Sequence, residues 1–545
     1  MGTVNKLDRQ SVKFDAAQMQ AMQRDPRVVV ALQRRAAERA TNIGSAPKTS
    51  AVPRVPKAAR PMIGKPALAL SGGGAKGSFQ IGALKYLYEE RGLKPKIVVG
   101  TSVGSINGVK LAEGEGKASK AAGHQSGLVG LTRGWLDIKN SDDMFREKSD
   151  FAKLKALAAN ADELREALES SGELSVAAAL TAVLAPGLVH LGVTTASMSQ
   201  NLQNLKTIAD AAELAESFLY SNGLVHLGPV KAKLEDPAYL DVELVQNSGI
   251  DFRAIWVGML SGQTYCTDAH RRLYRLDDPR TAIGSAPLRT SVLASSAQPM
   301  FMDTPIVKGE MGGKEYREKG FDGGVREIVG IRCAQRLGAT ETFAILCQPL
   351  DNELASIHEM KSQIEFEFPG VKKISQGFTY FNAETKRYRS LFELALRATD
   401  LTLSEVLEDD LASAAGEGTV HVIRPYIEVH DGMTLLPGLL RANMDHGWMC
   451  AFDLMRGSSK GEDAFLRGGN LLITENRREK ERFRNTQQLM KQFFSLFMSP
   501  KAVDQMTSEL AVAIQECNAR IAQGIAMRRA MDPDSLPTGA NDWDD

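Results

Sequence analysis

The chain has 545 residues, of which 43% are hydrophobic and 24% charged, a composition typical of globular proteins and not of disordered or fibrous ones. Its 66 Lys and Arg balance 66 Asp and Glu, so no overall positive charge points to nucleic acid as a partner. The length allows about two to four domain-sized units, or one elaborated α/β domain.

The five cysteines are spread singly along the chain, with neither a C-x-x-C pair nor a zinc-like spacing to histidine. Dispersed free thiols are typical of a reducing compartment. The first ten residues, MGTVNKLDRQ, lack the apolar core of a secretory signal. We therefore expect a cytoplasmic protein without a metal site, either free or peripheral to a membrane, and export without a cleaved signal stays open.

Residues 1–65 are expected to form a basic, largely flexible arm. They carry 13 Lys and Arg against four Asp and Glu, and they end in a Pro- and Ala-rich stretch. Such an arm either attracts an anionic membrane or is simply solvated.

The next elements alternate between strand and helix. The apolar run ALAL, a glycine-rich loop and a helix with Ile81, Leu84 and Tyr88 on one face follow residue 66. A short buried strand, KIVVG, comes next, and another helix starts near Ser102. This alternation predicts an α/β fold with a mostly parallel central sheet.

A long, Ala- and Leu-rich, mostly helical insertion is expected at about 110–245, either as extra helices over the sheet or as a lid. Strand-like runs then return in FRAIWVGML, ETFAILCQP and GTVHVIRPYIEV. We predict an α/β domain over 66–430, a helical region over 431–530 and a disordered acidic tail over 531–545.

The glycine-rich loop GGGAKG (72–77) matches the dinucleotide-binding pattern G-x-G-x-x-G and has the expected strand before it and helix after it. A dinucleotide site also needs an acidic residue at the end of the second strand, where it binds the ribose. Here that strand ends in KIVVGTSVG, which contains no carboxylate. The nucleotide interpretation therefore loses its main support.

Ser102 stands instead at the end of the second strand, in the G-x-S-x-G sequence GTSVG (100–104). Between a buried strand and a helix, this pattern predicts a nucleophile elbow, in which small neighbours permit a tight turn that exposes the hydroxyl. A second copy, GSSKG (457–461), follows a helical stretch and is expected to be a surface loop.

A nucleophilic serine needs a base and N–H donors for the oxyanion. The backbone of Gly72, Gly73 and Gly74 can supply these donors, and Lys76 either adds a cation or is a solvated loop residue. Asp322, in GFDGGVREIVG, is a candidate base. A Ser–Asp–His triad stays open as the alternative, because four histidines lie downstream: His358, His421, His430 and His446.

Together and in this order, GGGAKG, GTSVG and DGG (322–324) resemble the three signatures of the patatin-like phospholipase family, over roughly 66–125 and 250–350. LASSAQPMF (293–301) is similar to that family's small-residue helix and Pro-containing turn. The family often carries Asn and Pro shortly after Asp-Gly-Gly, and VREIVG has neither.

The resemblance implies a three-layer α/β/α sandwich that hydrolyses acyl esters of phospholipids or lysophospholipids at a membrane surface, without cofactor or metal. Ser102 would be the nucleophile, and Asp322 its sole general base in a dyad. The other motif residues would be the oxyanion loop and its supports: Gly72, Gly73, Gly74, Lys76, Gly77, Gly100, Gly104, Gly323 and Gly324. The alternative is a lipid- or nucleotide-binding protein that is catalytically silent or waits for an activating protein partner or ligand.

Overall fold

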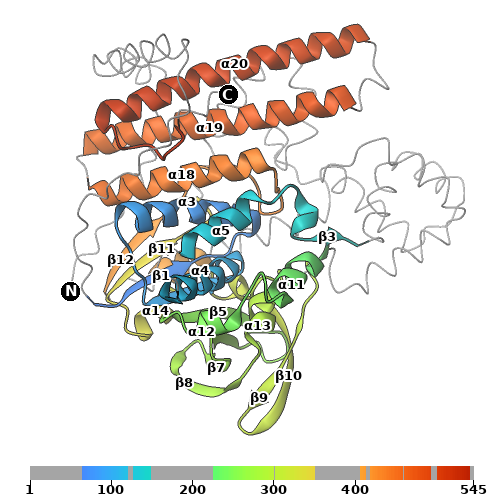
Figure 1. Cartoon of the computed structure of the whole chain (residues 1–545), viewed down its shortest axis with the longest axis vertical. Helices are drawn as coiled ribbons and strands as arrows, with labels where there is room; N and C mark the ends of the chain where they lie inside the picture. The colour runs from blue at the N-terminus through green and yellow to red at the C-terminus, as the bar shows by residue number, and fades with distance from the viewer. Residues whose placement is uncertain are drawn as a thin grey trace, which may run out of the picture.

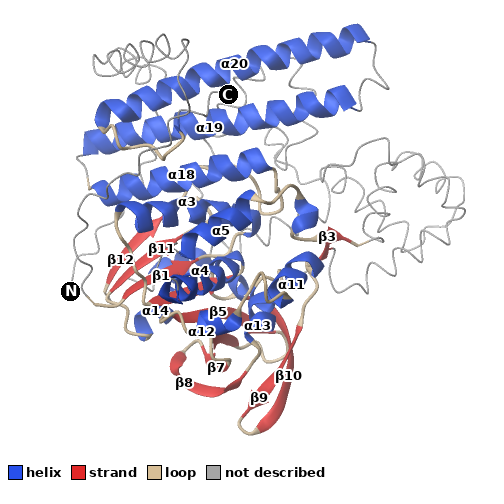
Figure 2. Cartoon of the chain, viewed as in Figure 1, coloured by secondary structure: helices blue, strands red, loops and turns tan. Residues whose placement is uncertain are grey.

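The computed structural model describes residues 64–120, 127–148, 225–299, 301–349, 406–412, 418–457, 460–492 and 500–540. Within these ranges a ten-stranded mixed sheet lies among helices, and long helices are stacked on one side of it (Figure 1). Figure 2 shows the strands in red and the helices in blue, and part of the sheet projects beyond the helices at the bottom of the view. Residues 1–63 of the expected arm and 149–224 of the expected insertion lie outside the described residues.

The first half of the sheet is parallel, in the order β12-β11-β1-β2-β5. Both central strands of this half, β1 and β2, are buried throughout, as their apolar sequences predict. The strands are β1 (Pro66–Leu70), β2 (Ile97–Thr101), β5 (Asp251–Gly258), β11 (Glu341–Ile345) and β12 (Thr419–Ile423).

The second half of the sheet is antiparallel. Its strands are β6 (Thr264–Asp268), β7 (Arg272–Arg275), β8 (Asp278–Ser285), β9 (Ile306–Met311) and β10 (Lys314–Asp322). Each pairs with the next, and β10 also pairs with β5, so the strands from β5 to β10 close into a ring. The ring returns the end of β10 to the parallel half.

Helices cover both faces of the parallel strands. Successive strand residues point to opposite faces, so a wholly apolar strand has apolar side chains on both. Leu68 and Val98 belong to the apolar cluster that contains residues of α3 (Ser78–Lys85), α4 (Val103–Lys120) and α5 (Gly127–Leu136). Their neighbours Ala67 and Val99 pack with α14 (Ile331–Arg336) on the other face. The predicted three-layer α/β/α sandwich is confirmed. The sheet is mixed rather than mostly parallel, because the strands from β5 to β10 pair antiparallel.

Short elements connect these layers. They are η1 (Gly74–Gly77), η2 (Tyr86–Glu90), η3 (Ser141–Asp143), β3 (Arg146–Glu147), β4 (Val225–His226), α11 (Gly228–Glu235), α12 (Val242–Gln246), α13 (Leu288–Ser295) and η4 (Gly323–Val325).

The predicted helical C-terminal region is also confirmed. It consists of α18 (Pro437–Arg456), α19 (Lys460–Gln492) and α20 (Pro500–Met531), which are stacked away from the sheet in that order (Figure 1). Helix α18 lies directly on α3, and two glycines permit this approach. A Cβ on Gly82 would stand 1.6 Å from the Met444 carbonyl oxygen, and one on Gly447 would stand 2.0 Å from that of Phe79.

The expected disorder from residue 531 onwards is wrong for residues 532–540. The buried Arg528 guanidinium donates to the Ser535 carbonyl at 2.7 and 2.9 Å and forms an ion pair with Asp453 at 2.8 Å. Leu536 and Ala540 are buried as well. Residues 532–540 are polar in sequence, and they are held by Arg528, a buried arginine in the preceding helix.

All five cysteines are free thiols, as expected, and all five are buried. In the part of the chain that the structure describes, none of the helices combines the length and apolar character needed to cross a bilayer.

The crossing of α3 and α18 predicts that Gly82→Ala lowers the free energy of unfolding by about 3 kcal/mol, because the added methyl group would overlap the Met444 backbone. Denaturant unfolding measures this loss. Gly130→Ala in α5 is the control: no atom lies within 4 Å of its added Cβ, so we expect no loss of stability. Equal effects of the two changes would contradict this view of the crossing.

Candidate active site

One edge of β5 aligns the ends of two other strands. Thr101, the last residue of β2, pairs with Ile255, and Asp322, the last residue of β10, pairs with the next residue, Trp256. Strand β6 occupies the opposite edge of β5 over these positions. Asp322 therefore lies on the same side of β5 as Thr101, next to Ser102.

Ser102 forms the turn between β2 and α4 and has a positive φ of 54°. This left-handed conformation costs a non-glycine residue on the order of 1–2 kcal/mol. The flanking glycines make the turn possible, because a Cβ on Gly100 would stand 2.3 Å from the Gly104 carbonyl oxygen, and one on Gly104 would stand 2.1 Å from that of Leu70. The predicted sequence of strand, strained serine and helix is present.

Serines at the end of α13 hold this turn. The Ser102 N–H donates to Ser295 Oγ at 2.9 Å, and the Ser296 hydroxyl donates to the Ser102 carbonyl at 3.3 Å. A third hydroxyl, that of Ser105, donates to the same carbonyl at 2.7 Å. The sequence indicated a helix of small residues here, and the structure adds that two of its hydroxyl groups orient the Ser102 backbone.

The Ser102 hydroxyl lies beside the Asp322 carboxyl group and, as a hydrogen-bond donor toward it, lowers its pKa. A second donor, the Gly324 N–H, lies 2.8 Å from Asp322 Oδ1. Burial raises the pKa of Asp322 to about 7, and the two donors lower it by less than burial raises it. A carboxyl group with this pKa can take up and release a proton near neutral pH.

The glycine-rich loop passes beside Ser102, since a Cβ on Gly72 would stand 3.1 Å from the Cβ of Ser102. Gly73 and Gly74 have φ values of 155° and 56°, and added Cβ atoms would stand 2.4 Å from the Cys347 Cβ and from the Gly432 carbonyl oxygen. Only glycine fits at these two positions.

The amides of this loop differ in what they bind. The Gly72 N–H donates to the Ile328 carbonyl at 3.1 Å. Among the described residues, no acceptor receives the N–H of Gly73 or of Gly74. Gly73 and Gly74 are therefore the glycines of this loop whose amides have no acceptor among the described residues.

The family model described as "Patatin-like phospholipase" matches residues 68–332, which contain the glycine loop, the serine turn and Asp-Gly-Gly. Residues 68–332 belong to the patatin-like phospholipase family. The crystal structure of VipD from Legionella pneumophila is similar over 87% of this chain and 89% of that chain, at 13% identity and a TM-score of 0.28, too distant a likeness to support an argument. No curated protein matches the chain.

Lys76 lies in the patatin-like domain but binds a residue outside it. Its ammonium group pairs with Glu428 at 2.8 Å, and both side chains are largely buried. The charge that the sequence offered for an oxyanion is thus already balanced by a carboxylate, which the sequence did not indicate.

Three of the four histidines that the sequence offered as bases lie elsewhere. His421 contacts Glu341 at 2.8 Å, His430 contacts Ser78 at 3.4 Å and His446 contacts Asn470 at 2.8 Å. His358 lies outside the described residues. In the hydrogen bonds of the described residues, His421, His430 and His446 contact neither Ser102 nor Asp322.

The remaining motif residues have close-packing roles. A Cβ on Gly323 would stand 2.6 Å from the Ile255 carbonyl oxygen, and one on Gly77 would stand 2.6 Å from Val103 Cγ2. Gly457, the first residue of the second G-x-S-x-G copy, ends α18 with a φ of 63°, and Ser459 lies outside the described residues.

The pKa of Asp322 predicts a change in stability. An unfolded aspartate ionises near pH 4 and this one near pH 7, so folded stability falls as the pH rises from about 4 to 7. Asp322→Asn removes that loss, and we expect the variant to exceed the wild type by roughly 2–4 kcal/mol at pH 8 and to differ little at pH 4.

Thermal unfolding at the two pH values measures this difference. Asp137→Asn, at a side chain that is 73% exposed, is the control and should change stability little at either pH. A variant of Asp322 that is less stable than the wild type at both pH values would contradict the raised pKa.

Proposed function

We propose that the protein is a serine acyl hydrolase that cleaves fatty-acyl esters of phospholipids or lysophospholipids through a Ser102–Asp322 dyad. The observation that carries this proposal is that the strained Ser102 lies beside Asp322, a buried carboxyl group whose pKa is about 7. Membership of the patatin-like phospholipase family supports a lipid acyl ester as the substrate class.

In the first step, Asp322 accepts the Ser102 proton as Oγ attacks the ester carbonyl carbon. The N–H groups of Gly73 and Gly74 stabilise the oxyanion, and the alcohol or lysolipid leaves with a proton from Asp322. We omit Gly72 and Lys76 from the oxyanion donors, because the Gly72 amide binds Ile328 and the Lys76 ammonium binds Glu428.

In the second step, Asp322 removes a proton from water, and the hydroxide attacks the acyl carbon bound to Ser102. Collapse of the intermediate releases the fatty acid and returns the proton to the Ser102 oxygen. The same carboxyl group thus serves as base and acid in turn, and a pKa near the working pH suits both tasks.

We predict that Ser102→Ala and Asp322→Asn each lower kcat/KM on a phospholipid by at least about 10³-fold, because the dyad acts as a unit. In the wild type, kcat/KM should rise with pH up to about 7 and then level off, since the base must be ionised. Fatty-acid release from a lipid panel measures the loss in the variants and the pH dependence of the wild type. Ser459→Ala in the second G-x-S-x-G copy is the matched control for the variants.

Labelling with a fluorophosphonate separates the enzyme from the silent binding protein. Label that is lost in Ser102→Ala supports the hydrolase. A folded wild-type protein that never labels, with or without cell extract, supports a binder. Activity that survives Asp322→Asn but is lost on one His→Ala change would replace the dyad by a triad.

We also propose that the active site faces a lipid surface, from a cytoplasmic protein peripheral to the membrane. The turn between β5 and β6 extends past the edge of the sheet where Ser102 and Asp322 lie. Three apolar residues are exposed here: Met259 by 48%, Leu260 by 84% and, in the loop after Asp322, Val325 by 37%.

This turn is held in place although its apolar tip is exposed. The buried Glu318 carboxylate accepts the Ser261 N–H at 2.6 Å and its hydroxyl at 3.1 Å, and the Arg326 side chain donates to the Gly262 carbonyl. A fixed apolar tip beside a cationic side chain is suited to the boundary between acyl chains and anionic headgroups.

The lipid-facing turn predicts that Leu260→Glu lowers hydrolysis of anionic vesicles about tenfold and leaves hydrolysis of a monomeric short-chain ester unchanged. A charge at the tip resists transfer into the apolar layer. Val512→Glu, at a 47% exposed position on α20, is the control. Equal loss with both substrates, or no loss with vesicles, would rule out this orientation.

A further inference from the structure

The loop after Asp322 is fixed by a carboxylate from a distant part of the chain. Residues 406–412 are helical, and Asp410 in this helix is 2% exposed. Its Oδ2 accepts the backbone N–H of Ile328 at 2.7 Å and that of Val329 at 3.2 Å. One oxygen atom thus determines the direction of two successive peptide groups.

The peptide group between Ile328 and Val329 also binds the glycine-rich loop. The carbonyl of Ile328 accepts the Gly72 N–H at 3.1 Å, and Gly72 lies against Ser102. Hydrogen bonds therefore run without a break from Asp410 through Ile328 to the residue that precedes the two proposed oxyanion donors. A change at Asp410 is expected to move these donors relative to Ser102.

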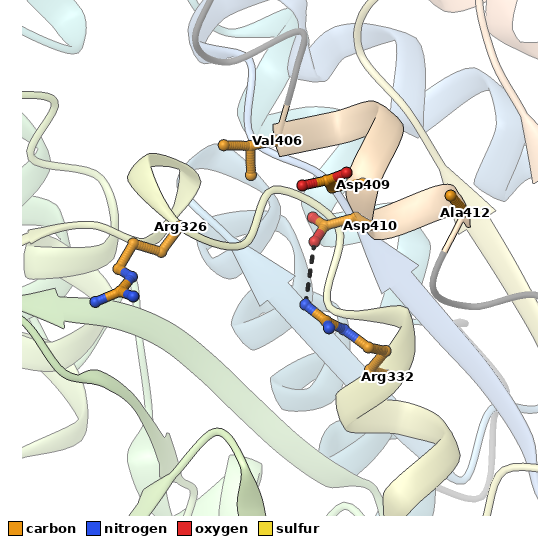
Figure 3. A pocket seen from close by; sticks show the side chains of 6 residues that line it. All are labelled: Arg326, Arg332, Val406, Asp409, Asp410 and Ala412. Atoms are coloured by element: carbon orange, nitrogen blue, oxygen red, sulfur yellow. Dashed lines mark ion pairs between the residues drawn. The ribbon is translucent and has the colours of Figure 1, made fainter.

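Glu327 completes the support from within the loop. Its Oε1 accepts the Gly330 N–H at 3.0 Å, and its Oε2 accepts from the Arg332 guanidinium at 3.0 Å. Arg332 also pairs with Asp410 Oδ1 at 3.6 Å, which Figure 3 shows as a dashed line. Three successive amides, those of residues 328 to 330, are therefore bound by two carboxylates that share one guanidinium.

Glu327 and Asp410 bind the segment after Asp-Gly-Gly, in which this sequence lacks residues that the family often has. The segment VREIVG has neither the Asn nor the Pro that often follows Asp-Gly-Gly. In this chain the carboxylates of Glu327 and Asp410 bind the backbone of that segment instead.

We propose that Asp410 is a positioning residue for the Ser102–Asp322 site, holding the proposed oxyanion loop in register through Ile328. The proposal rests on the proposed function, since it concerns how the amides of Gly73 and Gly74 are placed. Asp410 touches neither Ser102 nor Asp322 in the described contacts, so its effect passes through the backbone.

The position of Asp410 calls for an acceptor more than for a negative charge. Burial and the neighbouring Glu327 carboxylate raise the pKa of Asp410 to about 7. A protonated carboxyl group still accepts hydrogen bonds through its carbonyl oxygen. Asparagine offers the same oxygen without the charge, whereas leucine has a similar volume and no acceptor.

The experiment compares Asp410→Asn and Asp410→Leu with Asp409→Leu, the exposed neighbour, as the control. The rate of fluorophosphonate labelling at Ser102 is expected to fall about 10- to 100-fold in Asp410→Leu, since a displacement near 1 Å has effects of this size. Asp410→Asn should stay within about threefold of the wild type. Asp410→Ser, whose hydroxyl is too short to reach both amides, replaces Asp410→Leu if that variant does not fold.

Hydrogen–deuterium exchange supplies a readout that needs no activity. In Asp410→Leu, peptides covering 70–77 and 323–332 should exchange faster, while those covering α18 should not change. Unchanged labelling and exchange in Asp410→Leu would overturn the proposal. An Asp410→Asn variant as impaired as Asp410→Leu would also overturn it, because the negative charge of Asp410 would then have the main role. A wild type that never labels refutes the proposed function. In that case the exchange of peptides covering 70–77 alone tests whether Asp410 positions the glycine-rich loop.

Discussion

Strand β5 offers one edge to two partners, and this shared edge fixes where Ser102 and Asp322 lie. Strand β2 runs parallel to β5 and ends opposite Ile255, and β10 arrives antiparallel and ends opposite Trp256. Hydrogen bonds of the sheet thus set Thr101, the residue before Ser102, and Asp322 one residue apart along β5. The antiparallel strands begin at β5 and form a ring, and the last of them, β10, pairs with β5 again. The ring therefore brings Asp322 to the edge of β5 that β2 also occupies.

The energetic cost of the site is concentrated in a few groups. Ser102 has a left-handed backbone, and Asp322 is a buried carboxyl group without a cationic partner among its described contacts. The surrounding structure balances both costs with hydroxyl groups from α13, with backbone amides and with close glycine contacts. Strain and desolvation held in this way are characteristic of functional sites.

Local sequence was sufficient for the elements and motifs that depend on neighbouring residues. The apolar runs predicted β1 and β2, and the glycines around Ser102 predicted a tight turn between strand and helix. The assignment of Asp322 as the partner of Ser102 came from family resemblance, since no local pattern reports that β10 ends beside β2.

What the sequence did not reveal depends on contacts between distant segments. Lys76 pairs with Glu428, the Gly72 amide binds Ile328, and Asp410 binds the backbone of the loop after Asp322. Each of these contacts needs the fold to be known first. The residues at 532–540 show the same limit, because their order depends on Arg528, which a polar sequence does not indicate.

A crystal structure of the protein after reaction with a fluorophosphonate examines the arrangement on β5 most directly. It should show phosphorus bonded to Ser102 Oγ, the phosphoryl oxygen within hydrogen-bond distance of the Gly73 and Gly74 amides, and the Asp322 carboxyl group beside the adduct. Phosphorus on another serine, or a histidine between Ser102 and Asp322, would contradict it.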